Sequence, residues 1–136
     1  MTQKIVDMPK SETILVVDDE PGVLELVRII LDRHGYRILA VDSGAKALEI
    51  CERRDVRIDL LLTDVMMPGM NGLALVRQLK ALHQDLPVVY MTGGTLENLV
   101  EGEPDPQFPC VRKPFDPLSL AATIRNALDA VRYNAI

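Results

Sequence analysis

Three aspartates, a threonine and a lysine stand at the ends of apolar runs, where folding can bring them together. Asp18 and Asp19 follow the first run, and Asp64, Thr92 and Lys113 end or follow three later ones. Three carboxylates held close together repel one another, and a cation relieves that repulsion. Carboxylate oxygens suit a hard ion such as Mg²⁺, which binds few carboxylates and keeps waters and phosphate oxygens as its other ligands. With a lysine and a hydroxyl beside it, such a site can hold a phosphoryl group.

The elements that must position these residues are five short strands that alternate with helices. Continuous apolar and β-branched runs are typical of strands buried on both faces of a parallel sheet. The predicted strands are residues 13–17, 36–41, 58–63, 87–91 and 111–112. This alternation indicates right-handed βαβ units and a sheet that helices cover on both faces. Ligands of such sheets bind at the carboxyl ends of the strands, so we expect all five polar residues at that edge.

Helical spacing and capping residues place the helices between the strands. Pro21 suits the first turn of one helix, and Gly35 is the expected left-handed residue that ends it. Ser43 and Asn71 are the predicted N-caps of the next two helices, and the last helix begins at Asp116-Pro117. Between the fourth and fifth strands, Pro residues at 104, 106 and 109 oppose a long helix. We therefore expect a loop over residues 101–109, among the more mobile parts of the chain.

Length and composition are typical of a single globular domain, and the pattern of strands and helices makes it an α/β domain. The chain has 136 residues, of which 48% are hydrophobic and 26% charged, and its net charge is −5. We expect a polar leader at residues 1–11, a single domain at residues 12–131 and a tail at residues 132–136. The acidic balance and few aromatics argue against direct nucleic-acid binding. No apolar run reaches the roughly 20 residues of a membrane helix, and no signal core is present. We expect a cytoplasmic protein without membrane insertion.

Four motifs at the strand ends resemble the receiver domain of two-component response regulators. They are Val17-Asp18-Asp19-Glu20, Thr63-Asp64-Val65-Met66-Met67-Pro68-Gly69-Met70-Asn71-Gly72, Met91-Thr92-Gly93 and Lys113-Pro114-Phe115. Each motif alone is weakly specific, whereas all four in order at strand ends are specific together. The resemblance covers nearly the whole chain. It implies a flavodoxin-like (βα)5 three-layer sandwich with a five-stranded parallel sheet in the order 2-1-3-4-5.

The resemblance also implies a role for each acidic residue. Asp64 would accept a phosphoryl group from the phosphohistidine of a histidine kinase or a histidine phosphotransfer protein. Asp19, Asp64 and the backbone carbonyl of Met66 would ligate Mg²⁺, and Asp18 would act mostly through a bound water. The chain would catalyse only its own phosphorylation and dephosphorylation, so it would be a switch of protein contacts and not a turnover enzyme.

Thr92 and Lys113 would contact the phosphoryl oxygens in the same resemblance. A positive charge there offsets the charge that develops on these oxygens during transfer. We predict a cis peptide bond between Lys113 and Pro114, because Lys113 must turn at once for its ammonium to reach back over Asp64. The cis form of an X–Pro bond costs only about 0.5–1 kcal/mol, and the resemblance implies the same geometry.

One position departs from the family pattern. Cys110 stands three residues before the lysine, where receivers often have Tyr or Phe, and Tyr90 and Phe108 lie nearby but out of register. The usual coupling between Thr92 and that aromatic ring is therefore in question. Residues 132–136 are too few for an output domain. We expect the chain to act through a downstream protein, by passing the phosphoryl group on, or as part of a longer protein such as a hybrid sensor kinase.

Two alternatives share parts of this pattern. A pseudo-receiver is a binding module with the same fold that is not phosphorylated, and it usually lacks one of Asp19, Asp64 or Lys113, all of which are present here. A Mg²⁺-dependent phosphohydrolase with an aspartyl nucleophile generally has a second acidic residue two positions later, where this chain has Met66. Such an enzyme also needs a cap or a substrate pocket, for which 136 residues leave little room.

Overall fold

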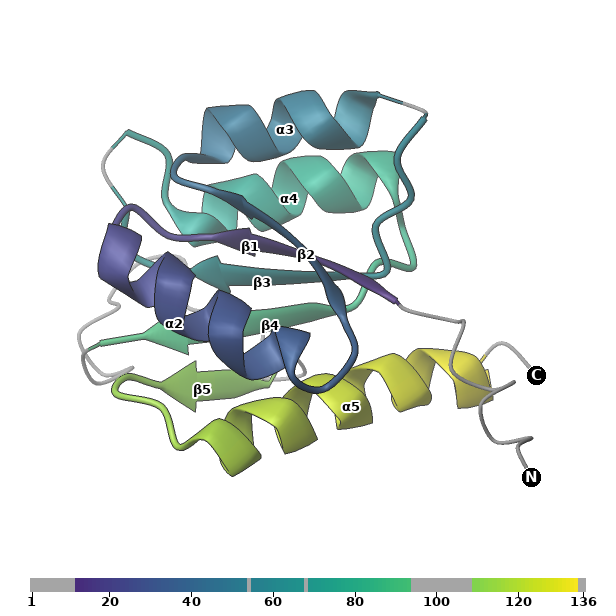
Figure 1. The fold of residues 1–136 in the computed structure, drawn as a ribbon. Coiled ribbons are helices and arrows are strands. Elements are labelled where there is room, and N and C mark those ends of the chain that lie inside the picture. The colour runs from purple at the N-terminus through teal and green to yellow at the C-terminus, as the bar shows by residue number, and fades with distance from the viewer. Residues whose placement is uncertain (1–11, 54, 68, 94–108, 135–136) are drawn as a thin grey trace.

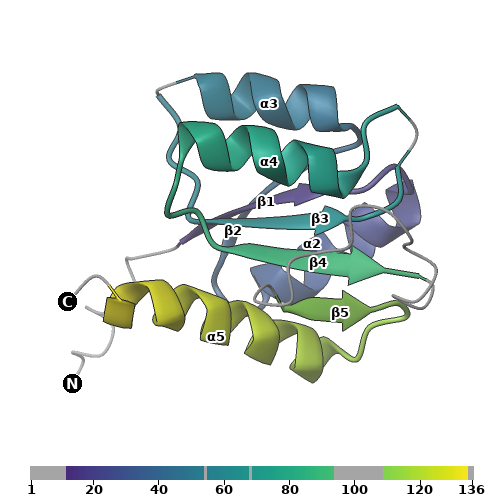
Figure 2. The same ribbon diagram turned by 180° about the vertical axis from the view of Figure 1, so that it is seen from behind.

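The computed structural model describes residues 12–134 except 54, 68 and 94–108, and its centre is a five-stranded parallel sheet between two layers of helices (Figures 1 and 2). The strands are β1 (Thr13–Val17), β2 (Arg37–Val41), β3 (Leu60–Asp64), β4 (Val88–Thr92) and β5 (Cys110–Arg112). The helices are α2 (Pro21–Asp32), α3 (Gly44–Glu52), α4 (Gly72–Leu82) and α5 (Pro117–Asn134). The strand order is β2-β1-β3-β4-β5 with every neighbouring pair parallel. The flavodoxin-like fold predicted from the sequence is therefore confirmed.

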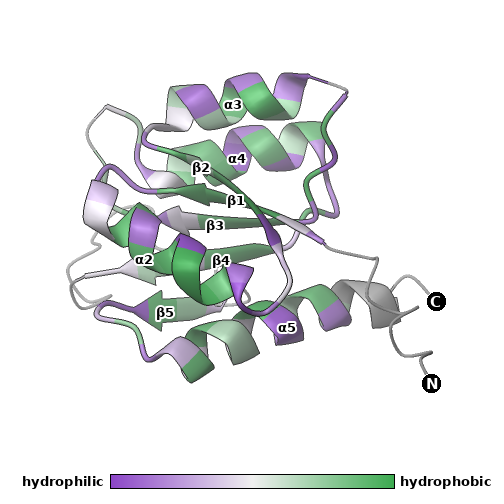
Figure 3. Cartoon of the chain, in the orientation of Figure 1, coloured by the Kyte–Doolittle hydropathy of each residue, from purple (hydrophilic) through white to green (hydrophobic). Residues whose placement is uncertain are grey.

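Each face of the sheet has its own hydrophobic core. Successive side chains of a strand point to opposite faces, so β1 places Ile14 and Val16 in the core beneath α2 and α5, and Leu15 and Val17 in the core beneath α3 and α4. Figure 3 shows the result, with strands that are mostly hydrophobic and helices that carry hydrophobic and hydrophilic residues together. This two-sided burial explains why the strands read as continuous apolar runs.

The predicted helix boundaries have the expected chemistry. The side chains of Ser43, Asn71 and Asp116 each accept a hydrogen bond from the backbone N–H three residues later, at 3.2, 2.8 and 3.0 Å. Pro21 is the first residue of α2, and Gly35 has a φ of 86° beyond its end. A residue with a Cβ is strained at that φ, whereas glycine adopts it without steric strain. No helix among the described residues is both long and apolar enough to span a bilayer.

Some boundaries differ from the predicted ones. Strand β3 begins at Leu60 and not at residue 58. Just before it, the Asp59 N–H donates to the Thr13 carbonyl at 2.9 Å, and the Asp59 carboxylate accepts the Thr13 N–H at 2.8 Å. Helix α5 continues to Asn134, beyond the last residue of the apolar stripe that predicted it. The apolar stripe that predicted this helix ends at Val131, so the spacing of apolar residues does not predict the helical residues after it. The predicted leader and nearly all of the predicted loop at 101–109 lie outside the described residues.

Arg125 joins α5 to the amino-terminal edge of the sheet. Its guanidinium lies 2.9 Å from Glu12 Oε2, 3.1 Å from Asp129 Oδ1 and 3.3 Å from the Tyr36 hydroxyl. Glu12 and Tyr36 directly precede β1 and β2. Arginine offers five donors in a planar fork, which suits several acceptors at once. The network therefore ties the last helix to the start of two neighbouring strands.

We expect Arg125→Ala to lower the free energy of unfolding by about 1–2 kcal/mol, because it leaves Glu12 and the buried Tyr36 without this donor. Arg125→Lys keeps the charge but loses the fork, so it should recover only part of the loss. The exposed Arg28→Ala is the matched control on α2. Urea denaturation measures all three, and an Arg125→Ala protein as stable as the Arg28→Ala control would contradict the role given to this network.

Candidate functional site

The carboxyl ends of β1 and β3 bring three aspartates together. These strands are neighbours, with Val17 paired to Thr63, so the residues that follow meet at one edge of the sheet. Asp18, Asp19 and Asp64 each offer one carboxylate oxygen, and these oxygens all lie within 4.8 Å of one another. Asp18 and Asp64 are buried, and Asp19 is exposed. The expected cluster of carboxylates is therefore present.

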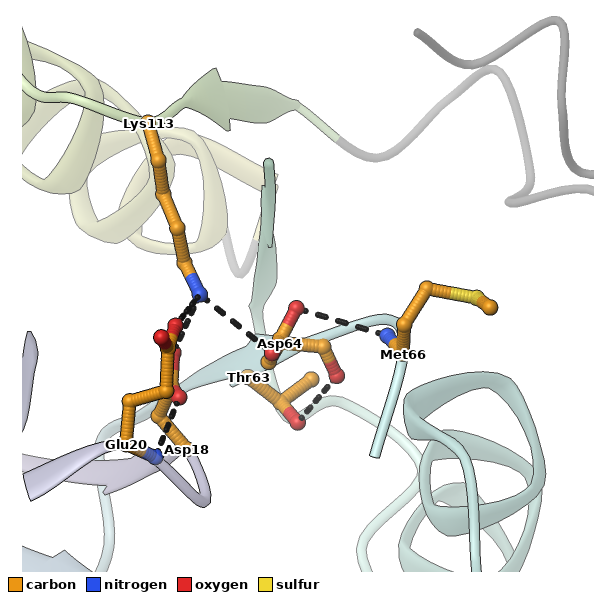
Figure 4. A network of polar contacts seen from close by, with 6 residues as sticks. All are labelled: Asp18, Glu20, Thr63, Asp64, Met66 and Lys113. Carbon is orange, nitrogen blue, oxygen red and sulfur yellow. Dashed lines mark hydrogen bonds and ion pairs between the residues drawn. The ribbon is translucent and has the colours of Figure 1, made fainter. Parts of the chain in front are cut away.

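Lys113 reaches this cluster from β5, two strands away from β3 (Figure 4). Its ammonium nitrogen lies 2.7 Å from Asp18 Oδ2 and 3.3 Å from Asp64 Oδ2. Its backbone N–H donates to the carbonyl of Thr92 at 2.8 Å, and its bond to Pro114 is cis, as predicted. A third carboxylate, that of Glu20, lies 3.4 Å from the same ammonium. The sequence pattern assigns no separate role to Glu20, although it stands beside the two aspartates in the sequence.

The backbone around Asp64 is held by its neighbours. The Thr63 hydroxyl donates to the Asp64 carbonyl at 3.0 Å, and the Met66 N–H donates to Asp64 Oδ1 at 3.3 Å (Figure 4). Helix α4 begins against this backbone, because a Cβ placed on Gly72 would lie 2.1 Å from the Asp64 carbonyl oxygen. Sequence reasoning missed this close approach. A glycine in the first turn of a helix, directly after the N-cap Asn71, was the available signal.

The charges at this edge are coupled. Burial raises the pKa of the Asp64 carboxyl, and the negative charge of Asp18 raises it further against the opposing effect of Lys113. Burial lowers the pKa of the Lys113 ammonium, but the hydrogen bond to Asp18 and the charges of both aspartates outweigh it, so that pKa is raised. The pKa of Asp64 therefore lies above that of a free carboxyl, and Lys113 remains a cation beside it.

The donor set fits a small hard cation. Two oxygens bound to one Mg²⁺ at about 2.0–2.1 Å lie at most about 4.2 Å apart. The three carboxylate oxygens lie within 4.8 Å of one another, so side-chain shifts below one ångström bring them to such an ion. The predicted contribution of the Met66 carbonyl stays a prediction. Met66 lies two residues beyond Asp64, the last residue of β3, and its side chain is exposed.

Thr92 and Cys110 lie on the neighbouring strands β4 and β5. Thr92 is the buried last residue of β4, and the residue before it, Met91, pairs with Asp64 of β3. Cys110 is half-buried on β5 and lies directly across from Tyr90 of β4, whose side chain is 2% exposed. The sequence suggested that Tyr90 was out of register with position 110. In the structure an aromatic ring does belong to this part of the core, but β4 carries it.

Comparisons with known proteins agree with this geometry. Residues 14–125 match the response regulator receiver domain family. Over 129 residues the chain is 34% identical to the sensor kinase CckA of Brucella abortus, a match that covers 93% of this chain and 14% of the kinase. It is 31% identical over 124 residues to the response regulator SaeR of Staphylococcus aureus, with 88% of this chain and 51% of SaeR covered. The chain thus spans about half the length of SaeR and a much smaller part of the length of CckA.

A solved structure shows the same fold. The response regulator receiver protein from Sinorhizobium medicae superposes with a TM-score of 0.80 at 28% sequence identity, and the match covers 90% of this chain and 98% of that protein. The family match spans far more than half of the chain, and the sheet order and the acidic edge are those that the resemblance implied. The chain belongs to the response regulator receiver domain family of two-component systems.

Proposed function

We propose that this receiver domain accepts a phosphoryl group on Asp64 from a phosphohistidine in the cytoplasm, and that phosphorylation switches its contacts with a downstream protein. The donor is a histidine kinase or a histidine phosphotransfer protein. One observation carries the proposal. A buried carboxylate lies 3.3 Å from a lysine ammonium and close enough to two further carboxylates to share one cation with them.

In the proposed transfer, the phosphoryl group passes from a histidine nitrogen to a carboxylate oxygen. An oxygen of the Asp64 carboxylate attacks phosphorus, a P–O bond forms, and the P–N bond of phosphohistidine breaks with its electron pair left on the imidazole nitrogen. Water later attacks phosphorus and returns the carboxylate and inorganic phosphate. Lys113 and Thr92 would hold the phosphoryl oxygens, and Asp18, Asp19, Asp64 and the Met66 carbonyl would hold Mg²⁺. When bound, Mg²⁺ supplies positive charge that offsets the charge on the phosphoryl oxygens.

The direct test is covalent labelling. Acetyl phosphate with Mg²⁺ should add the mass of one phosphoryl group to the intact protein, and EDTA should prevent it. The label should be lost in mild base, as an acyl phosphate is. No mass increase under conditions in which another receiver is labelled would overturn the proposal and favour the pseudo-receiver, a binding module that is not phosphorylated.

Mg²⁺ should also stabilise the fold, because an ion that binds only the folded state adds RT ln(1 + [L]/Kd) to its stability. We expect a gain of about 1–2 kcal/mol at ten to thirty times the dissociation constant. Asp19→Asn should reduce this gain, whereas Asp32→Asn, a change at an exposed residue of α2, should not. Thermal melts across a Mg²⁺ titration measure the effect. Melting that stays constant up to tens of millimolar would count against the metal site.

A further inference from the structure

Glu20 adds a carboxylate to Lys113 that the proposed transfer does not use. Its Oε1 lies 3.4 Å from the Lys113 ammonium, on the same nitrogen that contacts Asp18 and Asp64 (Figure 4). The three carboxylates differ in exposure. The Asp18 side chain is fully buried and that of Asp64 nearly so, whereas the Glu20 side chain is 64% exposed. Glu20 is therefore the partner of Lys113 on the solvent side of the site.

The backbone of Glu20 is fixed in this position. Its N–H donates to Asp18 Oδ1 at 2.9 Å, and its carbonyl accepts the N–H groups of Val23 and Leu24 at 3.1 and 3.2 Å as α2 begins. Glu20 is the N-cap residue of α2. Because its backbone is held by these hydrogen bonds, only its side-chain torsions need to be ordered for the carboxylate to contact Lys113. The contact thus joins two residues that lie 93 positions apart in the chain.

We propose that Glu20 is a positioning residue that restrains the Lys113 ammonium and repels anionic phosphodonors, and so slows phosphorylation of Asp64. The inference rests on the proposed function. For a phosphoryl oxygen to reach Lys113, one of the three carboxylate contacts must loosen. The Asp18 contact is short and buried, and the Glu20 contact is long and exposed, so the Glu20 contact is the one that gives way.

The size of the effect follows from the exposure of the pair. Exposed ion pairs are worth about 0.2–1 kcal/mol, which corresponds to at most about a fivefold change in rate. A negative charge at the entrance also lowers the local concentration of anions, and salt screens this effect. The repulsion should therefore act more on a donor with two negative charges than on a donor with one.

The test compares phosphorylation rates with acetyl phosphate, a dianion at neutral pH, and phosphoramidate, a monoanion. With acetyl phosphate at low salt, Glu20→Gln should raise the rate about two- to fivefold. The gain should be smaller with phosphoramidate and should shrink as salt is added. Glu20→Asp keeps the charge and should stay closer to the natural protein. The matched control is Glu25→Gln, which removes the same charge from an exposed position of α2, the helix that Glu20 precedes.

Each other outcome overturns the inference. A rate in Glu20→Gln that is unchanged, or lowered, with both donors would show that Glu20 neither restrains Lys113 nor repels the donor. An equal gain in Glu25→Gln would show that overall charge, and not this contact, sets the rate. An equal gain with both donors at all salt concentrations would contradict the electrostatic part. No labelling of the natural protein would instead overturn the proposed function, and this inference with it.

Discussion

Asp64→Asn is expected to abolish labelling by acetyl phosphate. The amide oxygen carries no negative charge and is a far poorer nucleophile than a carboxylate, so no P–O bond forms at this position. The fold should persist, since asparagine has nearly the same shape and keeps an oxygen for the Met66 N–H. Intact mass after incubation with Mg²⁺ and acetyl phosphate measures the outcome. Labelling at the rate of the natural protein would remove Asp64 from the role proposed for it.

The same substitution should raise the melting temperature in EDTA. Burial first, and then the charge of Asp18, raises the pKa of Asp64 in the folded state, so ionisation of this group favours unfolding. The penalty appears as pH rises above the unfolded pKa of about 4 and is complete above the folded pKa. The stabilisation by Asp64→Asn should therefore be present at neutral pH and vanish below about pH 4. A lower melting temperature at neutral pH would show instead that the Lys113 pair dominates.

Gly72→Ala is expected to lower the free energy of unfolding by about 1–3 kcal/mol. Its Cβ would lie 2.1 Å from the Asp64 carbonyl oxygen and 3.1 Å from the Val65 Cα, so backbone atoms must move apart. The displaced backbone is that of the proposed phosphoacceptor, and a small misplacement of reacting groups slows a reaction. We therefore also expect slower labelling by acetyl phosphate in the fraction that stays folded.

Gly22→Ala is the matched control for that change. Gly22 is also in the first turn of a helix, and a Cβ placed on it meets no atom within 4 Å. Replacing glycine by alanine at such a position stabilises a protein by about 0.4–1 kcal/mol. The two glycine substitutions should therefore change stability in opposite directions. Equal stability of the two variants in urea would contradict the close approach of α4 to the Asp64 carbonyl.

Much of the fold was predictable because the signals are local. Mostly apolar runs marked the strands, and the uninterrupted run of β1 has the bounds that were predicted for it. Ser43, Asn71 and Gly35 marked helix ends through bonds and φ values that depend on residues within a few positions. The parallel topology then placed the ends of β1, β3, β4 and β5 at one edge. The acidic cluster was predictable for that reason alone.

Local signals did not predict every strand boundary, nor which residues of neighbouring strands lie opposite each other. The Asp59 carboxylate accepts the Thr13 N–H next to the first residue of β3, and Asp59, the charged residue inside the predicted strand, was the available signal for the later start at Leu60. The surroundings of Cys110 are a similar case. The sequence showed Cys110 in place of an aromatic residue, but only the register of β4 against β5 places Tyr90 directly opposite it.

The sequence by itself determined the order of the elements, their hydrophobic faces and the identity of the residues at the strand ends. Only the tertiary structure decided that Glu20 shares Lys113 with the aspartates, that Gly72 has no room for a Cβ, and that Arg125 reaches Glu12 from 113 residues away. Hydrophobic periodicity and capping depend on residues a few positions apart. Contacts between distant segments depend on strand register and helix packing to within an ångström or two, and residue spacing in the sequence does not encode those distances.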